Sequence, residues 1–393
     1  MESVRLGLKV EFAGIKFPNP IFLASGFPIG YGSGKILKKA ALAGAGGVVA
    51  RSVFVEKHEP CIGIRPRYSF LDKSSIHIDG VYEGVKKFTE KELKIAKEGR
   101  VPVIVSILGR TMDEYLKLAK AVEKAGAEMI EVNLSCPSSR ELGLEEELVG
   151  LRPIIAQMPE ASKQVVKRVR EVVSVPLMTK LTAFCDDIGA VAKAVEDGGA
   201  DAVAATNTLP NVLAYIDLDT GKPPIPTLGV YGGAGIKPLA LGAVVNIAKS
   251  VKIPISGIGG VSNWRDAVEM IMAGATTVQV CTAALMEGFG VFKKITRGIE
   301  EFMDDKRYKN ITDFRGIALK HIYSLEEVKK EPLIAAVNKE LCTGCNKCVE
   351  ICAYEAPQLK TEKIAHIDPR KCVGCGLCLQ ICPFDAISMK KTA

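Results

Sequence analysis

An alternation of two short signals along the first 300 residues most constrains the fold of this chain. The first signal is an apolar segment that opens with proline, at Pro20, Pro102, Pro176 and Pro254. The second is the pattern Gly-Ala-x-x-apolar, at Gly44, Gly126, Gly199 and Gly274. Proline is tolerated at the first residue of a strand, and glycine commonly ends a helix before the chain enters the next strand. Because the two signals alternate regularly, they predict four β-α-β-α units.

Eight strands alternating with eight helices predict an α/β fold, a closed (β/α)8 TIM barrel. The expected strands VVARS, MIEVN, AVAAT and VQVCT are mostly apolar on both faces, which is typical of a parallel sheet covered by helices. The helix expected over 111–125 opens with a capping box of Thr111 and Glu114. An open doubly wound sheet usually has fewer strands, and its G-x-G-x-x-G motif after the first strand is missing.

The expected strands all end in polar or glycine residues, and in such barrels the chemistry lies at these carboxyl ends. These residues are Ser25, Arg51, Ser52, Ser106, Asn133 to Cys136, Lys180 to Thr182, Thr206 to Thr208, Gly257 to Gly260, Cys281 and Thr282. One polar strand end is usually just the start of a loop. Eight of them around one mouth predict a polar site.

Eight of the 12 cysteines form two runs near the C-terminus. The first run is Cys342, Cys345, Cys348 and Cys352, and the second is Cys372, Cys375, Cys378 and Cys382. This spacing is that of two-cluster bacterial ferredoxins, in which the fourth cysteine of each run ligates the other cluster. We therefore expect one 4Fe–4S cluster on Cys342, Cys345, Cys348 and Cys382, and a second on Cys372, Cys375, Cys378 and Cys352. Two structural zinc sites are the alternative, although they usually pair two cysteine knuckles across a longer loop.

Iron–sulfur clusters carry single electrons, so the barrel needs a redox cofactor that reacts with substrate. Glycines at the ends of the last two strands suit a phosphate group, and Lys180 suits a developing negative charge. None of the four histidines lies at a strand end, which disfavours haem and a catalytic histidine. FMN meets these demands and converts a hydride into single electrons.

Cys136 is the candidate catalytic residue. A free cysteine is often only a small buried hydrophobe. However, Cys136 ends a strand and precedes a polar loop at 138–147 that we expect to close as a lid, which favours a general acid or base. Cys281 is expected to support the phosphate loop, whereas Cys61 and Cys185 have no comparable context.

The overall composition excludes several classes of protein. Hydrophobic residues make up 48% and charged residues 25%, which is ordinary globular composition. The net charge of +7 is spread among interleaved acidic and basic residues, so a nucleic-acid partner is not expected. The N-terminus lacks the apolar core of a signal peptide, and no apolar stretch is long enough to span a membrane. A cytoplasmic protein is the expectation, and there clustered cysteines indicate metal ligation.

The motifs NLSCP, KLT, ATNT, YGGAG, GIGG and VQVCTA occur in this order on the expected barrel. In this the chain resembles the dihydroorotate dehydrogenase superfamily. With a two-cluster tail it is most similar to the dihydropyrimidine dehydrogenase branch, in particular the catalytic subunit of the bacterial NAD-dependent enzyme. The resemblance covers nearly the whole chain. It implies an FMN that exchanges a hydride with C6 of a pyrimidine ring while a cysteine transfers the proton at C5.

The resemblance also implies residue roles. Cys136 matches the acid/base. The pyrimidine would contact Asp72, Asn133, Leu134, Ser135, Asn207 and Thr208. The flavin would contact Ser25, Arg51, Ser52, Lys180, Gly235, Gly259, Gly260, Cys281 and Thr282.

Three positions depart from the family pattern. Arg51 replaces a flavin-contacting lysine, and Ser138 replaces a histidine or asparagine. Asp72 occupies the place of an asparagine that reads the pyrimidine, and an ionised Asp72 only accepts hydrogen bonds. Such changes redirect an enzyme to another ring.

The expected domains are an FMN-binding barrel over 1–319, a linker over 320–337 and a ferredoxin-like domain over 338–393. The expected activity is reduction of the 5,6 double bond of uracil or thymine, or the reverse reaction. The alternatives are a dihydroorotate dehydrogenase, a reductase of another conjugated C=C compound, or an electron-transfer subunit of a larger complex. Because no FAD or NAD fingerprint is present, electrons are expected from an FAD/NAD(P)H-binding subunit or a ferredoxin, within a homodimer or heterotetramer.

Overall fold

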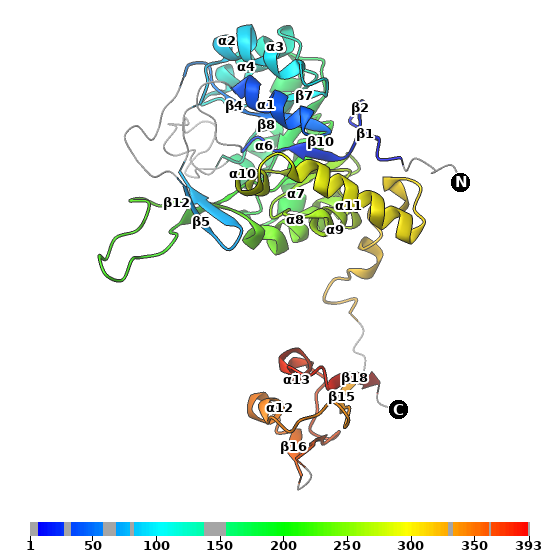
Figure 1. Ribbon diagram of the computed structural model, residues 1–393. Coiled ribbons are helices and arrows are strands. Elements are labelled where there is room, and N and C mark those ends of the chain that lie inside the picture. The colour runs from blue at the N-terminus through cyan, green and yellow to red at the C-terminus, as the bar shows by residue number, and fades with distance from the viewer. Residues whose placement is uncertain are drawn as a thin grey trace. The chain divides into compact units, whose positions relative to one another are not determined.

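The computed structural model describes residues 7–26, 33–57, 68–78, 82–136, 155–328, 333–360 and 363–391. The chain divides into two compact units, Met1–His321 and Ile322–Ala393 (Figure 1).

Eight parallel strands close the larger unit into a barrel, in the order β10-β13-β14-β3-β4-β7-β8-β9. Their bounds are β3 Ile21–Leu23, β4 Gly47–Val53, β7 Val103–Ile107, β8 Met129–Asn133, β9 Leu177–Lys180, β10 Ala202–Ala205, β13 Ile255–Ile258 and β14 Thr277–Val280. Each strand follows one of the proline or glycine signals in the sequence. The expected TIM barrel is therefore confirmed.

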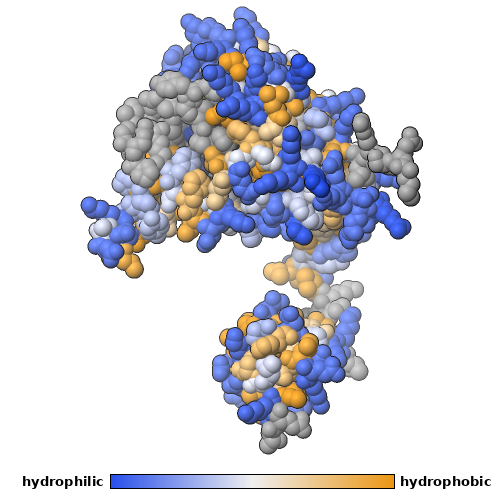
Figure 2. Space-filling model, in the orientation of Figure 1, coloured by the Kyte–Doolittle hydropathy of each residue, from blue (hydrophilic) through white to orange (hydrophobic). Residues whose placement is uncertain are grey.

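Helices cover the outside of the barrel (Figure 1). They are α1 Ser33–Leu42, α2 Val85–Lys87, α3 Leu93–Lys97, α4 Met112–Lys124, α6 Pro159–Arg170, α7 Ile188–Asp197, α8 Lys237–Ser250, α9 Trp264–Met272, α10 Thr282–Glu287 and α11 Val291–Lys306, with a π-helical turn, η1 Phe88–Glu92, between α2 and α3. Helix α4 shows the general pattern, because Tyr115, Leu118 and Val122 recur at helical spacing and are all buried. In Figure 2, hydrophilic side chains cover most of the visible outer face of this unit, and hydrophobic ones form separate small groups.

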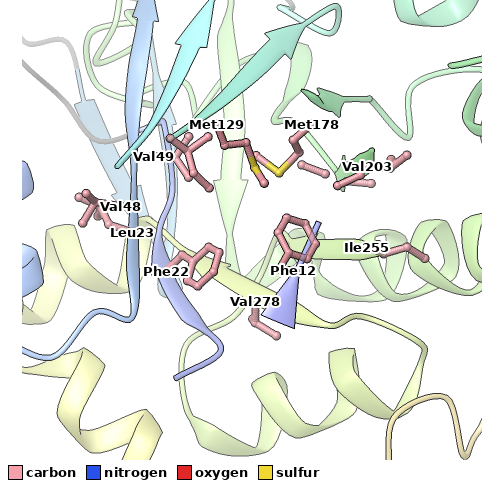
Figure 3. Packing of buried hydrophobic residues seen from close by; sticks show 14 of the residues in the cluster. Phe12, Phe22, Leu23, Val48, Val49, Met129, Met178, Val203, Ile255 and Val278 are labelled. Carbon is pink, nitrogen blue, oxygen red and sulfur yellow. The ribbon is translucent and has the colours of Figure 1, made fainter. Parts of the chain in front are cut away.

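Part of the hydrophobic core fills the barrel at the amino ends of its strands. The hairpin of β1 Val10–Phe12 and β2 Ile15–Phe17 precedes the first barrel strand and brings Phe12 into this core. Phe12 lies near Phe22, Met129 and Met178, which project from three barrel strands (Figure 3). The chemistry is thereby left to the opposite, carboxyl end of the strands.

A four-stranded antiparallel sheet, in the order β11-β12-β6-β5, lies outside the barrel repeat and was not predicted. It joins β5 Tyr68–Leu71 and β6 Ser74–His77, which follow barrel strand β4, to β11 Leu209–Val212 and β12 Gly229–Gly233, which follow β10. The expected YGGAG loop is thus partly strand, because β12 ends at Gly233.

The smaller unit repeats one short pattern twice. Strand β15 Leu333–Val337 pairs with β18 Ile387–Lys391, and β16 Pro357–Leu359 pairs with β17 Ala365–Ile367. Two short helices, α12 Lys347–Ile351 and α13 Leu377–Ile381, pack together. Because β15 pairs with the last strand, residues 333–337 belong to this unit and not to the linker expected over 320–337. In the described part of the chain, no helix has the length and apolar character needed to cross a membrane.

Candidate active site

A cavity of about 930 Å³ opens at the carboxyl ends of the barrel strands. The sequence-predicted residues that line it are Ser25, Arg51, Ser52, Asn133, Cys136, Lys180, Asn207, Thr208, Gly259, Gly260, Cys281 and Thr282. Of the residues expected to contact the ring or the flavin, Asp72, Leu134, Ser135 and Gly235 do not line it, and of the other expected strand ends, Ser106, Leu181, Thr182 and Gly257 do not line it either.

One wall of the cavity is a network of amide and hydroxyl groups at the ends of β8 and β10. Asn133 donates from Nδ2 to Ser52 Oγ at 2.9 Å, and its Oδ1 accepts from the Ser135 backbone N–H at 3.1 Å. Asn207 donates from Nδ2 to the Ser135 carbonyl oxygen at 2.9 Å, and its Oδ1 accepts from the Thr208 N–H. Ser135 therefore joins the two asparagines from behind the wall instead of lining the cavity.

Cys136 lies beside this network and is 5% exposed. The hydroxyl of Tyr115 on α4 donates to the Asn133 carbonyl oxygen at 2.9 Å and so fixes the end of β8. Burial, followed by the nearby charge of an ionised Cys136, raises the pKa of Tyr115 far above its usual range. The Tyr115 hydroxyl consequently keeps its proton and remains a donor.

Two cations, Lys180 and Arg51, also line the cavity. Lys180 is buried and donates from Nζ to Ser25 Oγ at 2.9 Å. The Arg51 guanidinium lies 4.4 Å from the centre of the Tyr82 ring, which holds it in a cation–π contact. Burial raises the pKa of the Cys281 thiol to about 11, while the positive charges of Lys180 and Arg51 act in the opposite direction.

Glycines at the end of β13 form a tight cradle. Gly259 and Gly260 have φ values of +121° and +80°, in the region that favours glycine. A side chain on Gly260 would place its Cβ 2.5 Å from the Lys237 Cα, so only glycine fits there. This arrangement suits a phosphate held by backbone N–H groups. By contrast, the Gly235 N–H is occupied, because it donates to Ser74 Oγ at 2.9 Å.

Sequence reasoning missed several lining residues. Ser75 and His77 line the cavity from β6, and Tyr82 lines it from the segment after that strand. The family position assigned to Asp72 falls instead in the exposed turn between β5 and β6, at a φ of +45°. Ser75 and His77 lie two residues apart on one face of β6, but the local sequence does not show that this strand reaches the cavity.

Three residues of interest in the sequence lie outside the described part of the chain. They are Cys61, Pro137 and Ser138, and the polar loop over 138–147 lies there too.

The cysteines of the smaller unit surround two cavities of about 360 and 530 Å³. The first is lined by Cys342, Cys345, Cys348 and Cys382. The second is lined by Cys352, Cys372, Cys375 and Cys378. Each cavity thus brings together the four cysteines predicted for one cluster, including the fourth cysteine of the other run.

A cavity enclosed by four cysteines suits a cluster better than a single zinc ion. Across the described residues, no three His, Cys, Asp or Glu side chains are grouped as a single-ion site. A zinc ion needs four sulfurs about 2.3 Å from one point, whereas a cubane fills a cavity between them. Backbone N–H groups of Ala365 and Ala386 donate to Cys342 Sγ and Cys382 Sγ at 3.5 and 3.4 Å, and such bonds tune cluster potentials.

Family models match both units. The dihydroorotate dehydrogenase model matches residues 7–303, and a 4Fe–4S dicluster domain model matches residues 335–389. This chain belongs to the dihydroorotate dehydrogenase family. Its cofactors are therefore FMN and two 4Fe–4S clusters, as the sequence predicted, and it is an oxidoreductase.

Curated relatives in this family carry two different names. The chain is 38% identical over 322 residues to the catalytic subunit of dihydroorotate dehydrogenase B (NAD(+)) of Pyrococcus horikoshii, covering 81% of this chain and 99% of the relative. The corresponding subunit of Pyrococcus furiosus is 37% identical over 80% of this chain and 100% of the relative. The NAD-dependent dihydropyrimidine dehydrogenase subunit PreA of Escherichia coli is 29% identical over 88% of this chain and 85% of its own length.

Proposed function

We propose that this protein interconverts a pyrimidine ring and its 5,6-dihydro form, with hydride exchange through FMN and proton transfer by Cys136. The observation that carries the proposal is that Cys136 shares one cavity with the asparagine network and with the glycine cradle. When bound, FMN supplies the hydride chemistry and passes single electrons onward.

The roles of the chain's own residues follow from this geometry. Asn133, Asn207 and Thr208 hold the edge of the ring, because their amide and hydroxyl groups line one wall. Cys136 holds or receives the proton at C5 of the ring from its buried position beside them. Lys180, Arg51 and the cradle of Gly259 and Gly260 hold the flavin and its phosphate. Asp72, in the exposed turn between β5 and β6, is not part of the proposed arrangement.

Uracil or thymine is the proposed ring, since the relative named a dihydropyrimidine dehydrogenase subunit aligns over 88% of this chain. Dihydroorotate is a second candidate. Relatives with that name are more identical, and the cation Arg51 lines the cavity while no Asp or Glu is among the described lining residues. A planar guanidinium pairs well with the carboxylate that dihydroorotate carries and uracil lacks.

Anaerobic flavin absorbance tests the proposal and separates the candidates. Dihydrouracil or dihydrothymine should bleach the oxidised flavin, and uracil or thymine should restore the colour of the reduced flavin. Bleaching by dihydroorotate alone would select the second candidate. If none of these compounds changes the flavin spectrum, the pyrimidine assignment is wrong.

The role of Cys136 has its own test. Cys136→Ala should lower the rate of flavin reduction by substrate about 100-fold or more, because it removes a positioned acid/base. Flavin content should remain unchanged. Cys185→Ala is the matched control, since Cys185 does not line the cavity, and it should react like the wild type. Unchanged turnover in Cys136→Ala would exclude the acid/base role.

Electron exchange with another protein is part of the proposal. The relatives are named as subunits, and this chain carries no dinucleotide fingerprint, so we propose an FAD/NAD(P)H-binding subunit or a free ferredoxin as partner. A homodimer or heterotetramer is the proposed assembly. The eight cluster cysteines need reduced thiolates, so the proposed location is the cytoplasm.

A further inference from the structure

A buried carboxylate without a partner lies inside the barrel, below the cavity. Glu131 on β8 is 0% exposed, and neither of its carboxylate oxygens has a hydrogen-bond partner among the residues that the structure describes. Burying a charged group costs free energy unless a partner compensates the charge. A buried polar atom without a hydrogen bond therefore calls for an explanation such as an ordered water or ion.

Strand register shows which residues share the level of Glu131. Glu131 on β8 pairs with Met178 on β9, and Met178 pairs with Ala202 on β10. Because the strands of such a barrel are staggered, the β10 residue in the same layer as Glu131 is two residues beyond Ala202, at Ala204. The same step leads from β10 to β14, from β14 to β4 and from β4 back to Glu131 on β8. Four residues on alternate strands therefore form one closed layer. The layer consists of Val49, Glu131, Ala204 and Gln279.

This layer contains two polar side chains and two short apolar ones. Gln279 is 1% exposed and faces Glu131 from the opposite side of the barrel. In the described part of the chain, its Oε1 also has no hydrogen-bond partner. Its Nε2 donates to Ser256 Oγ at 3.1 Å, which fixes the amide. Ala204 and Val49 complete the layer with short side chains, which take up less of the barrel interior than Leu or Phe would. Polar sites of this kind hold ordered water where there is room for it.

A buried ammonium group lies one layer closer to the cavity. The same register step places Lys180 directly above, with Ala24, Ser106 and Ile258. Lys180 is opposite Asn133 on the neighbouring strand, so it is the diagonal neighbour of Glu131. It is 3% exposed, and its hydrogen bond to Ser25 uses one of three ammonium donors.

We propose that a buried water bridges the Lys180 ammonium and the Glu131 carboxylate, which makes Glu131 the counter-charge and positioning residue of Lys180. The water accepts one N–H from Lys180 and donates to an oxygen of Glu131, so no covalent bond changes. Both charges are then compensated inside the barrel, and the ammonium is held at the cavity floor. Only the consequence for the flavin rests on the proposed function.

A double-mutant cycle in the flavin-free, full-length protein tests this pairing. Glu131→Gln and Lys180→Gln should each lower the free energy of unfolding in denaturant, because each leaves one buried charge uncompensated. The double variant should lose clearly less than the sum of the two losses. Additive losses would overturn the proposal. Thr179→Val combined with Lys180→Gln is the matched control and should be additive, since Thr179 is buried but lies on the opposite face of β9.

Two further measurements keep the proposal testable if a variant folds poorly. In the FMN-loaded protein, Glu131→Gln should raise the flavin reduction potential, because uncompensated Lys180 favours the more negative reduced flavin. An unchanged or lowered potential would contradict the counter-charge role. A crystal structure should show a water within hydrogen-bond distance of Lys180 Nζ and Glu131, and an empty gap would refute the bridge. The stability cycle involves no ring substrate, so it can succeed where the proposed function fails.

Discussion

At the scale of single residues, the site depends on groups that hold the lining residues in place. Tyr115 is fully buried on α4, and its hydroxyl reaches the carbonyl of Asn133 at the end of β8. Its pKa is raised by burial, so the hydroxyl keeps its proton and donates. The sequence predicts the helix over 111–125, but it does not show this contact between the helix and the end of β8.

Tyr115→Phe should lower the free energy of unfolding by about 1 kcal/mol, because the Asn133 carbonyl loses its donor while the ring still fills its space. The KM for the ring substrate should rise, since Asn133 lines the cavity. Denaturant unfolding and steady-state kinetics measure the two effects. Tyr215→Phe, at an exposed position, serves as the control and should change neither. Wild-type values for Tyr115→Phe would show that the hydroxyl does not support the site.

Cys281 gives a prediction about pH. Burial raises the pKa of its thiol from 9.0 to about 11, so the folded state favours the neutral thiol. The resulting stabilisation is complete below the ordinary pKa and is lost as pH rises through about 11. Stability of the flavin-free protein should therefore fall over this range, and Cys281→Ser should make the fall shallower.

Denaturant midpoints measured from pH 8 to 11 check this expectation. Cys185 behaves as a comparison within the same chain, because burial also raises the pKa of its thiol to about 11. Cys185→Ser should flatten the same fall, and the double variant should flatten it further. Identical pH profiles for the wild type and the double variant would rule out both assignments.

At the scale of elements, local signals explain the barrel but not the antiparallel sheet. Each barrel strand follows a proline or glycine that marks its start in the sequence. Strand β6, SSIH, has no clear apolar alternation, and β12, GVYGG, is rich in glycine, which is a poor strand former. These two strands pair across about 150 residues of chain, so no local pattern reports their contact. His77 and Ser75 were missed for this reason.

The capping box at the start of α4 was predicted correctly for only one of its two hydrogen bonds. Thr111 Oγ1 accepts from the Glu114 N–H at 3.1 Å, as predicted. The reciprocal bond differs, because the Glu114 carboxylate accepts from the N–H of Arg110 at 2.7 Å. Spacing alone identifies the residues of a cap, while the path of the preceding chain decides which N–H they bind.

The glycine cradle is held by an ion-pair clamp between two helices. Lys237 at the start of α8 lies 2.7 Å from Asp266 and 2.8 Å from Glu269 of α9. Asp266 also accepts from the Ser262 N–H, so the clamp reaches the loop that follows Gly260. The pKa of Lys237 is raised by these hydrogen bonds, first by Asp266 and then by Glu269.

Lys237→Met should weaken FMN binding several-fold, because the cradle loses its tie to α8 while the apolar part of the side chain remains. Fluorescence titration of flavin-free protein measures the dissociation constant. Lys193→Met is the control, since Lys193 forms a similar pair of ion pairs on the exposed face of α7, with Glu196 and Asp197. An equal effect of both variants, or none for Lys237→Met, would show that the clamp does not shape the cradle.

At the scale of the whole molecule, the two units were the most predictable feature. Cysteine spacing alone predicted the sets around both cavities of the smaller unit, because each ligand position is fixed by the cluster and not by the surrounding fold. The barrel unit carries the substrate chemistry and the smaller unit carries electrons, so damage to one cluster should leave the first half of the reaction intact.

Cys348→Ser and Cys375→Ser each remove one ligand from a different cavity. Iron and acid-labile sulfide should each fall from about eight atoms per chain to about four, since one 4Fe–4S cluster is lost. Substrate should still bleach the flavin at the wild-type rate, because Cys136 and the cavity are unchanged. Reoxidation of the flavin by a one-electron acceptor should slow, because the path from the barrel is broken. Cys185→Ser should retain full iron, and a variant that kept full iron after loss of Cys348 or Cys375 would disprove that ligand assignment.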